Sequence, residues 1–252
     1  MFLFVAVLGV FISLSGMDLS YKNELKKELL GIILDKVDEE LSYYPDMNII
    51  EREILAGKIV KLGGRASIDG EDLVDGYYNG NYIRFSELVV KRYIGGNLKV
   101  TTFKGLYLKL EFNKHFHSQT IVVPDVAENL FGYAGKSAQN IISGSKLVYM
   151  EDPEFEKLFA VYSDDQVEAR YLLSTAFMQK LVETYKKVGP ISVSFIEDEM
   201  HLAFKTGHDF FKLSTDENLS SPSTVKHFYD DLKFIFDLID TFELNQKLWS
   251  KQ

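Results

Sequence analysis

The chain has 252 residues, a formal net charge of −9 and no cysteine. This length suits one large domain with or without appendages, and the 46% of apolar residues is sufficient for a hydrophobic core. The absence of cysteine excludes disulfides, thiolate nucleophiles and cysteine-containing zinc sites. Lys and Arg are scattered along the sequence. Because phosphate backbones need a basic stripe, we expect no nucleic acid partner.

Residues 1–17 form a hydrophobic segment whose first 16 residues carry no charge. A helix needs about 20 apolar residues to cross a bilayer core of about 30 Å, so this segment is short for a full span. We interpret it as a membrane anchor; a secretory signal peptide and a buried soluble helix are the alternatives. Three lysines follow directly, at Lys22, Lys26 and Lys27. By the positive-inside rule they place the remaining chain in the cytoplasm, at the inner membrane.

Residues 18–62 are predicted to form amphipathic juxtamembrane helices. In the first, residues 19–44, large aliphatic residues recur every four positions, and Lys26 belongs to the polar face. The second is predicted over residues 48–60. It begins with Asn48 and Glu51, a pairing that resembles a capping box.

From residue 63 the pattern changes to that of strands. Asn79-Gly80 predicts a type I′ hairpin turn, and Gly95-Gly96 marks a second turn. Residues 106–112 alternate between leucine or phenylalanine and polar or tyrosine side chains, which predicts one buried and one exposed face. Residues 119–124 predict a further strand that ends at its proline.

The C-terminal half mixes strands and helices. Residues 125–140 are predicted as a helix, and residues 191–205 as a hairpin that turns at Glu197-Asp198. The last helix begins near Pro222 and carries an apolar stripe at alternating spacings of three and four. Strands and helices without regular alternation predict an α+β fold. We therefore expect an antiparallel meander flanked by helices over residues 63–252, preceded by the N-terminal helices.

The acidic stretch of residues 151–174 is explained mainly by helix starts. Asp152 precedes a proline at the first helical position, which is typical of an N-cap. Asp165 with Glu168 forms a second capping-box pattern, and we place Val167 and Tyr171 on the inward face of that helix. A divalent-cation site is the alternative for this stretch, but no EF-hand spacing is present.

Arg170 is not explained by helix capping. A partly buried arginine usually has a carboxylate partner, so we expect an ion pair with Glu151 or Glu156. These three residues are the candidate binding residues. His115 and His117 are the candidate metal ligands, because residues two apart share one face of a strand. No third ligand is identifiable in the sequence, so histidines at a turn or strand end are the alternative.

Several longer motifs point to one family. The segments LVYMEDPEFEKLFAVYSDDQVEARYLLSTAFMQKL, GEDLVDGYYNGNYIRFSEL, FKGLYLKLEFNKHF and IVVPDVAENLFG resemble a bacterial family catalogued as domain of unknown function 3137. The resemblance extends over roughly 54–249 and implies membrane association and a LemA-like membrane protein as partner. It implies no activity, cofactor or catalytic residue. Members usually have more sequence before the domain, often with two hydrophobic helices.

These observations favour a membrane-tethered cytoplasmic module that binds a protein partner. A small-molecule-binding domain and an enzyme of unrecognised class are the alternatives. We predict no catalytic site and no cofactor. In particular, the GYAGKS segment lacks the first glycine and the preceding strand of a phosphate-binding loop.

Overall fold

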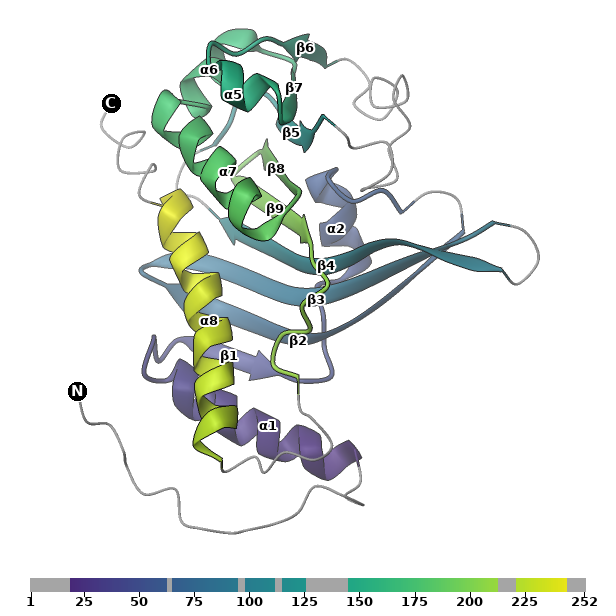
Figure 1. Ribbon diagram of the computed structural model, residues 1–252, viewed down its shortest axis with the longest axis vertical. Coiled ribbons are helices and arrows are strands. Elements are labelled where there is room, and N and C mark those ends of the chain that lie inside the picture. Colours follow the sequence, from purple (N-terminus) through teal and green to yellow (C-terminus); the bar gives the residue numbers. More distant parts are fainter. Residues whose placement is uncertain are drawn as a thin grey trace.

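The computed structural model describes residues 19–62, 65–94, 98–111, 115–125, 145–212 and 221–243. Within these residues, nine strands form one sheet in the order β1-β2-β3-β4-β9-β8-β5-β7-β6. Every neighbouring pair in that order is antiparallel. With the helices described below, this confirms the predicted α+β fold (Figure 1).

The strands differ widely in length, and the three longest are consecutive in the chain. They are β1 (Leu41–Tyr44), β2 (Ala66–Tyr78), β3 (Asn81–Tyr93), β4 (Lys99–Glu111), β5 (Thr120–Pro124), β6 (Lys146–Val148), β7 (Phe159–Ser163), β8 (Ile191–Ile196) and β9 (Glu199–Lys205). The helices are α1 (Leu19–Leu34), α2 (Glu51–Gly57), α5 (Pro153–Glu156), α6 (Gln166–Leu172), α7 (Thr175–Val188) and α8 (Pro222–Glu243).

The larger core lies between one face of the sheet and helices α1, α5, α6, α7 and α8. Helix α8 crosses in front of β2, β3 and β4 in Figure 1. Its predicted apolar stripe is confirmed by the buried side chains of Phe228, Leu232, Ile235, Ile239 and Phe242. Burial of such a stripe is the main source of stability for a helix in a globular protein.

The opposite face of the sheet carries a smaller core beneath residues 49–62, which include α2. In β4, Leu106 and Leu108 belong to the larger core, which confirms the predicted inward face. Tyr107 and Lys109 were expected in solvent, but they are only 0% and 6% exposed. The reason is that residues 49–62 cover this face, and a local alternation pattern carries no information about such a distant cover.

The predicted helix of residues 19–44 is wrong in its second half. Helix α1 ends at Leu34, and residues 41–44 form β1, which pairs with β2. Leu41 and Tyr43 are buried while the residues after each are exposed, which is the period of a strand. Leu41 continues the four-residue spacing of the preceding helix, yet it belongs to β1.

The start of α2 also differs from the prediction. The residue at the N-cap is Ile50, which makes no side-chain hydrogen bond there, so Asn48 is not the cap. Helix α2 is only seven residues long. Because β1 and α2 both pack on the sheet, residues 19–62 belong to the same packing unit as the strands after residue 63.

Two of the predicted turns are confirmed. Asn79 and Gly80 have φ of 51° and 80°, as a type I′ turn between β2 and β3 requires. The β8–β9 hairpin turns at Glu197-Asp198, where Glu197 has φ of 58°. The predicted glycine turn at 95–96 and most of the helix predicted at 125–140 lie outside the described residues.

The described helices include none that is both long enough and apolar enough to span a bilayer. The predicted anchor, residues 1–17, lies outside the described residues.

Candidate functional site

Both predicted aspartate caps are confirmed. Asp152 Oδ1 accepts hydrogen bonds from the backbone N–H groups two and three residues further on, at 2.8 and 3.0 Å. Asp165 Oδ1 does the same at the start of α6, at 2.7 and 3.2 Å. These carboxylates therefore satisfy N–H groups that have no partner inside the helix.

Glu168 has a different role from the one predicted. Instead of closing the capping box, its carboxylate accepts hydrogen bonds from the backbone N–H groups of His117 and Ser118, at 3.0 and 2.7 Å. It also accepts the Ser118 hydroxyl at 2.8 Å. Glu168 thus holds the loop before β5 against α6.

The inward face of α6 was predicted wrongly. Val167 is 77% exposed and Tyr171 is 42% exposed, whereas Ala169 and Leu172 are buried. The helix is only seven residues long, and an error of about half a turn, or two residues, exchanges its faces.

The expected ion pair of Arg170 is not formed. Within the described residues its guanidinium donates to the backbone carbonyls of Gln166 and Tyr149, at 3.4 and 3.3 Å, and the side chain is exposed. Glu156 instead accepts the N–H of Met150 at 2.6 Å, and Glu151 is exposed.

His115 and His117 lie near each other, with ring centroids 6.4 Å apart. Both are exposed and belong to a loop rather than a strand. Among the described residues they are not part of a group of three metal-ligating side chains. The group that does meet this condition consists of carboxylates at Glu71, Asp72 and Glu87.

A row of polar residues crosses six neighbouring strands on the α2 face of the sheet. Its members are opposite one another in register: Ser42, Asp75, Arg84, Lys109, His201 and Ser194. We call this set the polar row. The residues come from distant parts of the sequence, so no local motif indicates the polar row.

Carboxylates from α2 and from the ends of β4 and β9 form ion pairs with the polar row. Glu53 of α2 lies 2.7 Å from Arg84 and 3.3 Å from Lys109. Lys109 also lies 2.6 Å from Glu199 and 3.1 Å from Glu111. Each cation therefore has at least two carboxylate neighbours.

Electrostatics follow from this arrangement. Contact with His201 and Lys109 outweighs partial burial and lowers the pKa of Glu199 to about 2. Burial disfavours the charged form of Lys109, but its carboxylate neighbours outweigh burial and raise its pKa. The His201 Nε2 atom is 3.0 Å from a Glu199 carboxylate oxygen, but the two groups are not aligned for a hydrogen bond.

Helix α2 packs directly against the His201 end of the polar row. A Cβ atom on Gly57 would lie 2.1 Å from the Tyr107 hydroxyl and 2.8 Å from the His201 ring. The Tyr107 hydroxyl is itself 3.0 Å from His201 Nδ1. The close packing at Gly57 and the Glu53 ion pairs indicate that the polar row fastens α2 to the sheet.

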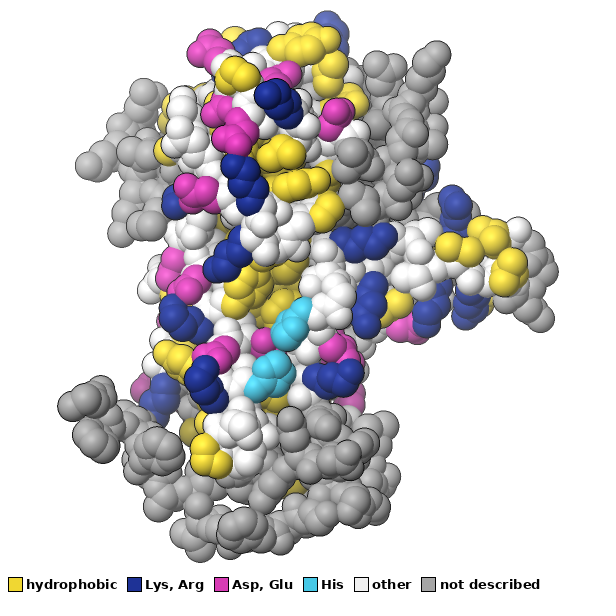
Figure 2. Space-filling model, viewed as in Figure 1, with side chains coloured by type: hydrophobic (Ala, Val, Ile, Leu, Met, Phe, Trp, Pro, Cys, Tyr) yellow, Lys and Arg dark blue, Asp and Glu magenta, His cyan; other side chains and the backbone are white. Residues whose placement is uncertain are grey.

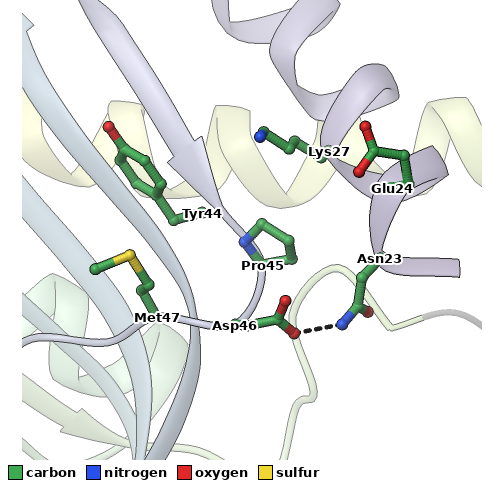
Figure 3. Close-up of a pocket in the computed structure, with 7 residues that line it drawn as sticks. All are labelled: Asn23, Glu24, Lys27, Tyr44, Pro45, Asp46 and Met47. Carbon is green, nitrogen blue, oxygen red and sulfur yellow. Dashed lines mark hydrogen bonds between the residues drawn. The ribbon is translucent and has the colours of Figure 1, made fainter. Parts of the chain in front are cut away.

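A shallow hollow of about 260 Å³ lies between α1 and the segment after β1 (Figure 3). It is lined by Asn23, Glu24, Lys27, Tyr44, Pro45, Asp46 and Met47. Its volume is below the range of about 300–1,000 Å³ that is usual for ligand pockets. The small-molecule hypothesis therefore gains no support from this hollow.

The outer end of β2, β3 and β4 projects from the molecule (Figure 1). This part of β4 comes before Gly105, where its pairing with β9 begins. We call residues 65–67, 91–94 and 98–101 the arm. Ile94, Leu98 and Val100 are 50%, 62% and 42% exposed. The cross-strand pairs of the arm place these three side chains on one face, together with exposed Arg92, which is opposite Val100.

The other face of the arm is cationic. Arg65 and Lys99 lie over the ring of Tyr93, at 4.7 and 4.8 Å from its centroid, and Lys91 lies on the same side of β3. Figure 2 shows hydrophobic and basic side chains side by side along this projection. The sequence shows basic residues as scattered, but hairpin pairing brings these together.

Comparison with known proteins identifies the family. A family model described as "Protein of unknown function (DUF3137)" matches residues 101–244. The chain belongs to this family. The resemblance noted from the sequence motifs is thereby confirmed, and the family description assigns no activity.

Among solved structures, the chain is similar to the crystal structure of the mycobacterial trehalose monomycolate transport factor A, TtfA. The two share 11% sequence identity with a TM-score of 0.39, over 84% of this chain and 94% of that chain. This degree of likeness supports no argument about function. No curated protein matches the chain.

Proposed function

We propose that this DUF3137 protein is a non-enzymatic accessory module that binds a membrane protein at the cytoplasmic face of the inner membrane. Residues 1–17 serve as its anchor and the arm as its contact surface. The observation that carries the proposal is the exposure of Ile94, Leu98 and Val100 on one face of a projecting ribbon. Exposed aliphatic side chains that gather on one element are typical of interaction sites.

The chemistry of the arm indicates the kind of partner. Its aliphatic face suits an apolar groove, while Arg65, Arg92 and Lys99 suit acidic residues beside that groove. Charge complementarity of this kind speeds association and excludes cationic surfaces. A LemA-like membrane protein is the partner class that the sequence motifs favour.

Photo-crosslinking in intact membranes tests the contact. A photoreactive amino acid in place of Leu98 should form a specific crosslink to a membrane protein. The same group in place of Leu55, which is 51% exposed on α2, serves as the control. The combined change Leu98→Ser and Lys99→Glu should weaken recovery of that partner by about tenfold or more, which corresponds to about 1.4 kcal/mol.

Two results would contradict this contact. Equal crosslinking from Leu98 and Leu55 would mean that the arm has no special role. Flotation of the chain without residues 1–17 with protein-free anionic vesicles, abolished by the same double change, would assign the arm to lipid instead of protein.

The anchor has its own test. Fractionation of cells should find the full chain in the membrane pellet after a high-salt wash, and a variant without residues 1–17 in the supernatant. Protease added to intact spheroplasts should leave the domain uncut, because the proposal places it in the cytoplasm. Cleavage there would support the signal-peptide alternative.

A further inference from the structure

Three carboxylates meet where β2 is interrupted by a bulge. Glu71 is directly opposite Glu87 on β3, and the register shifts between Glu71 and Val74. Asp72 lies inside the bulge with φ of 62°. One carboxylate oxygen from each of Glu71, Asp72 and Glu87 lies within 4.8 Å of the other two. Like charges opposite each other in a sheet are destabilising unless a cation is shared between them.

Asp72 provides an independent observation. It is 1% exposed, and its Oδ1 is 2.6 Å from Lys26 Nζ and accepts a hydrogen bond from the Tyr43 hydroxyl. Its Oδ2 is equally buried and has no hydrogen-bond partner in the described structure. A buried carboxylate oxygen without a partner is costly, so it indicates a group that the protein itself does not supply.

The charge balance agrees with a divalent ion. Glu71, Asp72 and Glu87 carry three negative charges when ionised, and Lys26 supplies one positive charge. The nearby Asp209 pairs with Lys212 at 3.1 Å and also contacts the Glu87 carboxyl group. With all three carboxylates ionised, two negative charges are left after Lys26 is counted, and one divalent cation neutralises them.

We propose that Glu71, Asp72 and Glu87 bind a divalent cation of the calcium class. Their donor atoms are all carboxylate oxygens, the ligands that hard cations prefer. Oxygens on opposite sides of Ca²⁺ are about 4.6–5.2 Å apart, and across Mg²⁺ about 4.0–4.2 Å. Mg²⁺ usually keeps several waters and binds through one or two carboxylates, so three carboxylates that converge within 4.8 Å of one another favour the larger ion. Lys26 stays on Oδ1, and the ion takes Oδ2.

The environment of the carboxylates is consistent with this site. Burial raises the pKa of Glu87 to about 8, although the N–H of Phe210 donates to it. Burial likewise raises the pKa of Asp72 to about 6, against the opposing effect of Lys26. The cation would stabilise the sheet bulge that carries the carboxylates. Through Asp72 and Glu87 it would also stabilise the contacts of the bulge with Lys26 of α1 and with Phe210 after β9. This proposal involves no residue of the arm and stands independently of the proposed function.

The test uses the full chain after removal of metals with a chelator. Calcium chloride should raise the melting temperature by several degrees, and magnesium chloride should have a smaller effect. Glu87→Gln and Glu71→Gln should each weaken Ca²⁺ binding, measured by calorimetry, by about tenfold or more. Both variants should still fold, because Gln matches the shape of a protonated Glu. Glu183→Gln, on the exposed face of α7, is the control and should bind Ca²⁺ as the unaltered chain does.

Two outcomes would overturn the site. No change in melting temperature with either cation at millimolar concentration would leave the cluster as a proton-sharing structural feature. Ca²⁺ binding that persists unchanged in Glu87→Gln and Glu71→Gln would place the ion elsewhere in the chain.

Discussion

Asp152 and Asp165 each accept two backbone N–H groups at the start of a helix, so removal of either carboxylate leaves those donors without a partner. We expect Asp152→Ala and Asp165→Ala each to lower the free energy of unfolding by about 1 kcal/mol. Urea denaturation measures this. Glu151→Ala is the matched control from the same stretch, and it should change stability little, because Glu151 is exposed. An equal loss in the control would remove the capping explanation.

Glu199 gives a prediction about pH. Its pKa falls from 4.5 to about 2 in the folded chain, through contact with His201 and Lys109. A carboxyl group with a lowered folded pKa stabilises the fold above its unfolded pKa, and that contribution is lost as pH falls from about 4.5 towards 2. In Glu199→Gln the free energy of unfolding should therefore fall less steeply between pH 4.5 and 2. At pH 7 it should be lower than in the unaltered chain by up to about 3 kcal/mol. Parallel stability curves for the variant and the unaltered chain would contradict this.

Residue roles were predictable only where the partner is close in sequence. The caps at Asp152 and Asp165 act on N–H groups two and three residues away, so the local pattern was sufficient. Glu168 acts on a loop about 50 residues earlier, and His201 meets Tyr107 across the sheet. No spacing rule connects residues that only strand pairing brings together.

At the scale of elements, α2 depends on its contact with the sheet. A helix of seven residues is too short to be stable alone, so burial and the Glu53 ion pairs must hold it. The sequence pattern predicted a helix here but could not show which surface it covers. The same limit explains β1, whose four residues were assigned to the preceding helix because a strand so short carries little pattern of its own.

Gly57→Ala tests how closely α2 approaches the polar row. The added methyl group would meet the Tyr107 hydroxyl and the His201 ring, so we expect a loss of stability of about 2–3 kcal/mol. Chemical denaturation measures the loss, and near-ultraviolet circular dichroism reports the environment of Tyr107. Gly31→Ala in α1 is the control. Nothing lies within 4 Å of its added Cβ, so the better helix propensity of alanine should keep or raise stability by up to about 1 kcal/mol. Equal effects at the two glycines would mean that α2 can shift to accommodate the added methyl group with little loss of stability.

At the scale of the whole molecule, the folding unit is larger than the segment that identifies the family. The family match spans residues 101–244, yet β1, β2 and β3 belong to the same sheet and lie before it. Hairpin signals and the stripe of α8 were sufficient to predict the α+β class. They could not give the strand order, because β4 pairs with β9 across about 95 residues of sequence.

This arrangement makes a prediction about truncation. A chain that begins at residue 101 would lack β3, which pairs with β4 along most of its length, and would expose Leu106, Leu108 and Leu110 at a free sheet edge. We expect it to aggregate and to show no cooperative thermal transition. A chain of residues 19–252 keeps every described strand and should unfold cooperatively, with the melting temperature of the full chain in detergent. If residues 101–252 alone gave a sharp transition of the same enthalpy per residue, the first three strands would be an addition to the fold, and the packing of α1 and α2 on the sheet would not be part of its stability.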